Sequence, residues 1–135
     1  MFLAITDILN WVLPITLGLL VGYMIATRGK NQNKDSLVYL NAEDFRQNMR
    51  KGQLIDLRSK EDFEKERING SRNFPKREIL GSLFKLRADQ PVFLYNETGT
   101  GTVKSVANKL AKKGFKPVYI LKEGFQEWPF IKKSN

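Results

Sequence analysis

Hydrophobic residues are concentrated near the start of the chain, where they form one long apolar segment. Residues 8–26, ILNWVLPITLGLLVGYMIA, run for 19 residues with Asn10 and Thr16 as their polar side chains. A helix of about 20 apolar residues spans the hydrocarbon core of a bilayer, and Trp11 and Tyr23 lie near the two ends, as interfacial aromatic residues do. The pattern predicts one N-terminal transmembrane helix.

The residues around this segment favour an uncleaved anchor over a secretory signal peptide. Asp7 precedes the apolar run, no Lys or Arg precedes it, and Met24 is too bulky for a signal-peptide cleavage site. Three basic residues follow between positions 28 and 34, so the positive-inside rule predicts a single-pass protein of the cell membrane with a cytoplasmic C-terminal domain. The segment 28–37 is polar and without periodicity, which indicates a linker.

The rest of the chain alternates between short apolar stretches and helix-like stretches. Strands are expected at Val38–Leu40, Leu54–Leu57, 91–96 and Val118–Leu121. Helices are expected after the capping residues Asn41 and Ser59, at 77–87 and at 102–114, with a closing turn or helical piece at Gly124–Trp128. This alternation predicts an α/β domain with a mostly parallel sheet covered by helices on both faces. We assign the anchor to residues 1–27, the domain to 38–130 and a short tail to 131–135.

The amino-acid composition limits the ligands that the chain can bind and the reactions that it can catalyse. The 135 residues carry 23 Lys and Arg against 14 Asp and Glu, a net charge of +9 at pH 7. Such a balance attracts anionic lipid or nucleic acid, but the positive residues are dispersed with few aromatics among them, which argues against nucleic-acid binding. The chain has no Cys and no His, which excludes disulfides, thiolate chemistry, Cys/His metal sites and imidazole catalysis. We expect no metal and no cofactor.

Two separated blocks of sequence resemble the rhodanese family. Residues 55–75, IDLRSKEDFEKERINGSRNFP, resemble its first block, in which D-x-R at a strand end precedes an acidic helix, an H-I-x-G-A turn and a proline. Residues 91–128 resemble its second block, in which a strand, the active loop and an amphipathic helix precede V-x-x-L-x-G-G-x-x-x-W. The resemblance implies a rhodanese-like fold over residues 38–130.

The resemblance also shows where this chain departs from the family. Catalytic members end the central strand with a cysteine in a loop like C-R-x-G-x-R and carry sulfur on it as a persulfide. Here Asn96 stands at the cysteine position, Glu97 and Gly101 replace the two arginines, and Arg67 replaces the His of the H-I-x-G-A turn. An amide cannot become a thiolate, and a carboxylate opposes the positive field that an anionic substrate needs. The resemblance therefore implies no catalytic residue and a degenerate active-site loop, namely Asn96, Glu97, Thr98, Gly99, Thr100, Gly101 and Thr102.

Without the family, the same loop has two interpretations. The backbone N–H groups of a glycine-rich turn at a helix start suit a phosphate or sulfate oxygen, and the loop threonines would add hydroxyl donors. Alternatively, Asn96 and the threonines satisfy the backbone of the turn itself, with Thr102 capping the next helix. The second interpretation is favoured, because caps are common. A threonine nucleophile would lack a base.

Charged residues in the first block are expected to be mainly structural. Asp56 and Arg58 are predicted to be architectural, and Gly70 to form a turn with Ile68 and Asn69. Arg58 is expected to form ordinary solvated pairs with the helical acids Glu61, Asp62 and Glu64. A basic run near the turn is expected to be a solvated face or a contact for lipid phosphates: Arg67, Arg72, Lys76 and Arg77.

Two classes of function follow. The first is a non-catalytic binding or regulatory module that presents its loop and basic surface to a protein partner at the cytoplasmic face of the membrane. The second is a sulfurtransferase-type enzyme that depends on a thiol of its partner, because no residue of this chain can hold a persulfide. Anionic lipid and a small anion are further candidate ligands.

Overall fold

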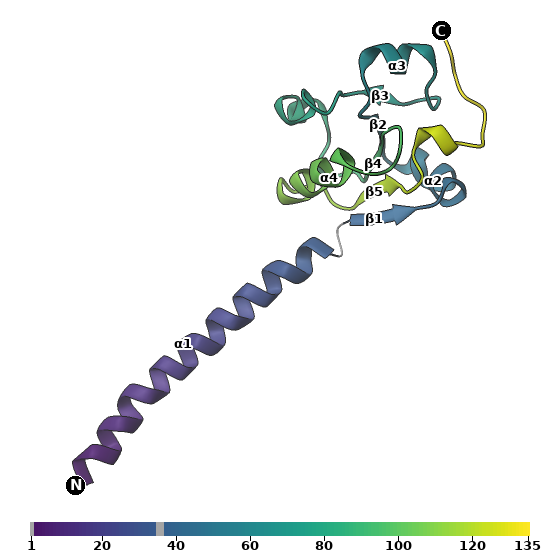
Figure 1. Ribbon diagram of the computed structural model, residues 1–135. Coiled ribbons are helices and arrows are strands. Elements are labelled where there is room, and N and C mark those ends of the chain that lie inside the picture. Colours follow the sequence, from purple (N-terminus) through teal and green to yellow (C-terminus); the bar gives the residue numbers. More distant parts are fainter. Residues whose placement is uncertain (1, 35–36) are drawn as a thin grey trace. The chain divides into compact units, whose positions relative to one another are not determined.

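The computed structural model describes residues 2–34 and 37–135 (Figure 1). The chain divides into two compact units, residues 1–34 and residues 35–135. Each unit is described separately below.

The first unit is a single helix, α1 (Phe2–Lys34). Its stretch Thr6–Met24 is long and apolar enough to cross a membrane. Pro14 lies inside the helix, and the hydroxyl of Thr16 donates to the carbonyl oxygens of Val12 and Leu13, each at 2.9 Å. The predicted apolar helix is therefore present.

The helix is longer than the sequence pattern indicated. It continues to Lys34, so most of the segment 28–37 that was expected to be a linker is helical. This segment is rich in Lys, Asn and Gln and has no proline, and extending an existing helix costs far less than starting one. Residues 35 and 36 lie outside the described residues, and the first strand begins at Leu37.

The second unit contains a five-stranded, fully parallel sheet with the strand order β1-β5-β4-β2-β3. Its strands are β1 (Leu37–Leu40), β2 (Gln53–Asp56), β3 (Arg72–Asn73), β4 (Val92–Tyr95) and β5 (Val118–Leu121). Four strands were predicted. The fifth, β3, was missed because two residues are too few to produce a recognisable alternation.

Short helices connect the strands. The helical elements are α2 (Ala42–Asn48), η1 (Met49–Lys51), α3 (Lys60–Lys65), η2 (Ile79–Gly81), η3 (Leu83–Lys85), α4 (Thr102–Lys112) and η4 (Phe125–Glu127). The predicted caps are confirmed: Asn41 accepts from the N–H of Asp44 at 2.8 Å, and Ser59 from the N–H of Asp62 at 3.2 Å. The helix expected at 77–87 is instead two 3-10 turns, interrupted where Gly81 and Ser82 give weak helical propensity.

Two hydrophobic cores cover the two faces of the sheet. On β4, Val92 and Leu94 contribute to one core while Phe93 and Tyr95 contribute to the other, as the alternation along a strand requires. The first core is closed by α4 and the η2–η3 segment, and the second by α2 and η4. The prediction of a parallel sheet with helices on both faces is confirmed. Both cores lie within residues 37–130, so this part of the chain has a hydrophobic core of its own, as a domain that folds alone requires.

Candidate functional site

The loop between β4 and α4 lies at the carboxyl end of the sheet, where parallel α/β folds place their sites. The segment after β5 holds it in place: the N–H of Phe125 donates to the carbonyl of Asn96 at 2.9 Å, and the N–H of Gln126 donates to that of Glu97 at 3.0 Å. Gly99 and Gly124 have positive φ angles of 77°. A Cβ atom at Gly99 would collide with the Lys122 carbonyl, so the loop and the segment after β5 interlock.

The side chain of Asn96 spans the interior of the loop. Its amide donates to the carbonyl of Thr100 at 2.9 Å and accepts from the N–H of Gly99 at 2.6 Å. The hydroxyl groups of Thr98 and Thr100 lie 2.9 Å apart and bond each other. These contacts agree with the interpretation in which the loop side chains satisfy the loop itself.

Thr102 does not cap α4, contrary to expectation. It is the first residue of the helix, and Gly101 occupies the capping position with φ 72° and no side-chain hydrogen bond. A cap requires a side-chain oxygen one residue before the helix, and glycine has none.

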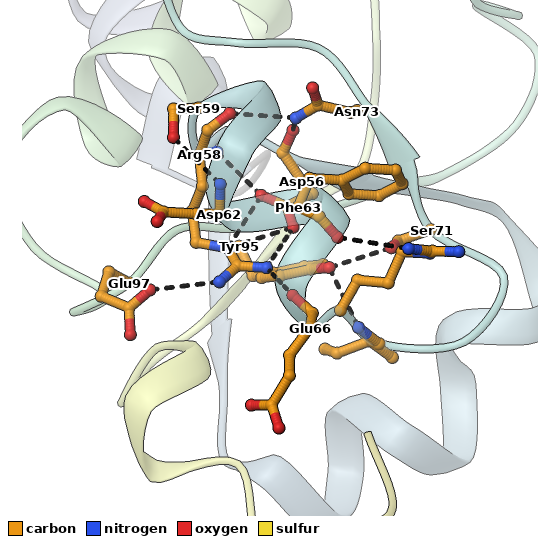
Figure 2. Close-up of polar contacts among 12 residues, drawn as sticks. Asp56, Arg58, Ser59, Asp62, Phe63, Glu66, Ser71, Asn73, Tyr95 and Glu97 are labelled. Carbon is orange, nitrogen blue, oxygen red and sulfur yellow. Dashed lines mark hydrogen bonds and ion pairs between the residues drawn. The ribbon is translucent and has the colours of Figure 1, made fainter. Parts of the chain in front are cut away.

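Arg58 connects the loop to the end of β2 (Figure 2). Its guanidinium bonds both carboxylate oxygens of Asp56, with Nη2–Oδ2 at 2.8 Å and Nε–Oδ1 at 3.2 Å. Nη1 pairs with Glu97 Oε2 at 3.2 Å, and Nη2 donates to the carbonyl of Glu66. The guanidinium also lies 4.0 Å from the ring centre of Phe125. One side chain therefore joins β2, the end of α3, the loop and η4.

Burial separates the two ion pairs of Arg58. Asp56 is fully buried and Arg58 is 8% exposed, whereas the side chain of Glu97 is 50% exposed. Burial pulls the pKa of Arg58 down, but the hydrogen bonds and charge of Asp56 outweigh it and hold that pKa above its ordinary value. The guanidinium therefore stays charged and keeps the buried carboxylate paired.

The expected partners of Arg58 were wrong. In the part of the chain that the structure describes, its ion pairs are with Asp56 and Glu97, and none is with the α3 acids Glu61, Asp62 or Glu64. The cause is the orientation of the side chains: that of Arg58 turns inward over the end of the sheet, while the acids of α3 are exposed. The D-x-R spacing could have indicated this contact, because a residue can bond its neighbour two positions away at a strand end.

Tyr95 is a buried member of the site that the sequence analysis did not identify. Its hydroxyl accepts from the N–H of Ile68 at 3.2 Å and bonds Ser71 Oγ at 2.9 Å, so β4 is tied to both ends of the turn at Gly70. Gly70 has φ 87°, as the predicted turn requires. Burial, followed by the charge of Asp56, raises the pKa of Tyr95.

A groove of about 510 Å³ opens beside the loop. Arg58, Asn96, Glu97 and Thr102 line one part of it, and other lining residues include Ser59, Asp62, Lys76 and Arg77. Two of the four residues of the predicted basic run, Lys76 and Arg77, therefore line this groove. The other two do not, because Arg67 bonds Asn135 at 2.9 Å and Arg72 bonds the Lys85 carbonyl at 3.3 Å. Among the described residues, no cluster of three or more acidic side chains could hold a metal ion.

Comparison with known proteins identifies the family. The family model described as Rhodanese-like domain matches residues 41–129, which include the loop, the Asp56–Arg58 pair and four of the five strands. The chain belongs to the rhodanese-like family. The matched region begins at the cap of α2 and ends just after η4, and the resemblance inferred from the two sequence blocks is confirmed.

Relatives and solved structures agree with this rhodanese-like assignment. The uncharacterized protein YqhL of Bacillus subtilis (strain 168) is 34% identical over 119 residues, covering 88% of this chain and 92% of YqhL. The uncharacterized protein YibN of Escherichia coli (strain K12) is 39% identical over 79 residues, covering 56% of this chain and 54% of YibN. A rhodanese-like domain protein from Staphylococcus aureus has a TM-score of 0.64 at 15% identity, covering 73% of this chain and 98% of that one. A rhodanese-related protein from Thermoplasma volcanium has a TM-score of 0.67 at 19% identity, covering 73% and 99%. These two structures share the fold.

Proposed function

We propose that this protein is a membrane-tethered rhodanese-like domain without sulfurtransferase activity, which binds a protein partner at the cytoplasmic face of the membrane. The observation that carries the proposal is the residue at the cysteine position of the loop between β4 and α4, and its hydrogen bonds. Asn96 stands where catalytic members have their cysteine, and its amide already bonds Gly99 and Thr100 across the loop. The chain contains no cysteine and therefore no thiol.

The charge at the loop also supports a non-catalytic role. Glu97 replaces an arginine of the family loop, and its carboxylate pairs with Arg58, the buried cation nearest to the groove. Two carboxylates, those of Asp56 and Glu97, thus face a single guanidinium. An anion such as thiosulfate would meet in Arg58 a cation whose charge is already compensated.

Tethering is supported by the sequence and by the helix. The apolar stretch Thr6–Met24 has the length of a bilayer core, and basic residues follow it. The Thr16 hydroxyl bonds within its own helix, which is the arrangement that hydrocarbon requires of a polar side chain.

An assay of the purified full chain tests the proposed absence of sulfurtransferase activity. With thiosulfate and cyanide as substrates, thiocyanate should form no faster than in buffer alone. The triple variant Asn96→Cys, Glu97→Arg and Gly101→Arg gives the matched control for the assay, because it restores the residue types of catalytic members. Steady turnover by the unaltered chain, free of contaminating thiols, would contradict a non-catalytic role.

Binding is read from photo-crosslinkers at Thr98 and Thr100 in native membranes. Both positions are exposed on the loop. The same discrete protein should be captured from both, and not from a crosslinker at Gln47, which is exposed on α2 and not in the loop. Capture of the same protein from all three positions, or of none from the loop, would exclude the loop as the docking site.

A further inference from the structure

The outer face of α4 is uniformly positive. Its buried stripe consists of Val103, Val106, Ala107, Leu110 and Ala111. Three lysines lie on the opposite side of the helix and two follow it, all exposed: Lys104, Lys109 and Lys112, then Lys113 and Lys116. At 100° per residue the three lysines within α4 spread across the half of the helix that faces away from the sheet. Residues 101–117 contain no Asp or Glu.

The protein itself does not neutralise this charge. Elsewhere in the described residues, Arg58, Lys60 and Arg87 pair with carboxylates, whereas none of the five lysines has an ion pair. The acids are concentrated elsewhere: residues 42–66, which include α2 and α3, hold seven of the 14 in the chain. The region of α4 therefore carries basic residues with no acid beside them in sequence, whereas α2 and α3 carry acids together with their basic residues.

An exposed aromatic residue lies on the same layer of the domain. Phe84 in η3 is 81% exposed, and Leu80 in η2 is 38% exposed. The ammonium of Lys85 lies 5.8 Å from the centre of the Phe84 ring. The η2–η3 segment and α4 close the same hydrophobic core, and Figure 1 shows them next to each other. This layer thus presents lysines together with an unburied ring, the combination that sits well between headgroups and acyl chains.

We propose that this layer is a membrane-docking face that rests on anionic phospholipid headgroups, with Phe84 entering the interface. We call the five lysines and Phe84 the basic face. The inference rests on the tethering part of the proposed function, because a tether keeps the domain beside a bilayer. It gives that domain a preferred orientation, with the basic face toward the lipid and α2 on the side of the sheet away from it.

The residue type favours lipid over a protein or nucleic-acid partner. All five positions are lysine, and none is arginine. Arginine is the residue that recognises a single carboxylate or phosphate through two parallel hydrogen bonds, whereas lysine acts as a point charge on a flexible stem. A row of point charges matches the diffuse negative potential of a bilayer better than the fixed positions of acids on a protein. The groove beside the loop is lined by none of the five lysines.

The effect of changing this face can be estimated. A basic residue near an anionic bilayer contributes about 1 kcal/mol, which corresponds to about fivefold in the docking equilibrium. Lys112→Glu with Lys113→Glu should therefore lower the ratio of docked to undocked domain by at least about 25-fold. Phe84→Ser should lower it by roughly tenfold, the lower end of the gain from burying a phenylalanine ring.

The experiment uses the full chain in nanodiscs, with an environment-sensitive fluorophore on Ser105→Cys. Ser105 is exposed among the α4 lysines, and the chain has no native Cys, so labelling is specific. Nitroxide-headgroup lipid should quench this probe in discs of phosphatidylcholine with about 30% phosphatidylglycerol, since the anionic lipid supplies the attraction. It should not do so in discs of phosphatidylcholine alone. Salt at about 0.5 M should release the domain, because the screening length then falls well below 10 Å.

Two controls isolate the basic face. A probe on Gln47→Cys, on the opposite side of the sheet, should remain unquenched in both kinds of disc. Lys51→Glu with Lys65→Glu makes the same change in net charge at exposed positions away from α4, and should leave quenching of the Ser105 probe within about twofold. A bulk effect of net charge would instead make the two double variants equivalent, and would overturn the proposal.

Failure of docking and failure of tethering give different results. If α1 does not insert, the chain is extracted from vesicles by alkaline carbonate, which contradicts the proposed function. If the chain resists extraction but the Ser105 probe is unquenched in anionic discs, or equally quenched in neutral discs, the docking face is refuted. A photo-crosslinker at Ser105 in native membranes should yield lipid adducts, and a discrete protein adduct with no lipid adduct would assign the basic face to a protein.

Discussion

Removing the arginine at the centre of the site should destabilise the domain strongly. Arg58→Met keeps most of the side-chain length but leaves the carboxylate of Asp56 fully buried without a cation. Asp56 would retain the N–H of residue 58, now 2.7 Å from Oδ1, and lose the three guanidinium contacts. Breaking a buried ion pair by removing one partner costs about 3–5 kcal/mol. We expect the free energy of unfolding to fall by that amount.

The exposed end of the network provides a matched comparison. Glu97→Gln removes the other ion pair of Arg58, but the Glu97 side chain is half exposed, so its loss should cost less than about 1 kcal/mol. Asp56→Asn in the Arg58→Met background removes the stranded charge and should recover part of the loss. The double variant should thus be more stable than the single variant Arg58→Met.

Urea unfolding of residues 35–135, followed by the fluorescence of Trp128 and by circular dichroism, measures these differences. Trp128 is the sole tryptophan of this part of the chain and is 5% exposed. A loss below about 1 kcal/mol for Arg58→Met, or no recovery with Asp56→Asn, would refute the view that the buried charge of Asp56 determines the cost.

Two further predictions concern the loop and Tyr95. Gly99→Ala should lower the melting temperature more than Gly101→Ala. An alanine at either position must adopt a positive φ, which costs about 1–2 kcal/mol, but a Cβ at Gly99 also meets the Lys122 carbonyl. Equal shifts in melting temperature, measured by calorimetry, would contradict the interlock. The folded state raises the pKa of Tyr95 above its ordinary value of 10.0, first by burial and then by Asp56. Its contribution to stability is therefore complete below pH 10 and decreases as the pH rises above it, so Tyr95→Phe should reduce the alkaline loss of stability seen in urea titrations, while Tyr39→Phe, at an exposed position, should not.

The sequence predicted elements wherever local chemistry determined them. Asn41 and Ser59 marked two helix starts because their side chains cap the backbone, and the helix expected at 102–114 corresponds to α4. It failed where the outcome depended on distant contacts or on very short elements. The two-residue strand β3 is defined by pairing with β2, and no pattern in two residues can show that.

The site was predicted in part. The position of the loop and the local bonding of Asn96 followed from a strand, a glycine-rich turn and a helix in sequence order. The pairing of Arg58 with Glu97, 39 residues away, did not follow, because acids nearer in sequence appeared to be better partners. Charged side chains choose partners by direction and burial, which a linear spacing does not contain.

The interlock between the loop and the segment after β5 limits how this surface can be altered. Because Gly99 packs against the Lys122 carbonyl and Gly124 against the Glu97 carbonyl, the inner contour of the loop is set by backbone on both sides. Added residues have no space inward and must extend into solvent at Thr98 or Thr100, both exposed. Substitutions at the exposed positions of the loop can therefore change the chemistry of this surface, while the backbone conformation of the loop stays the same.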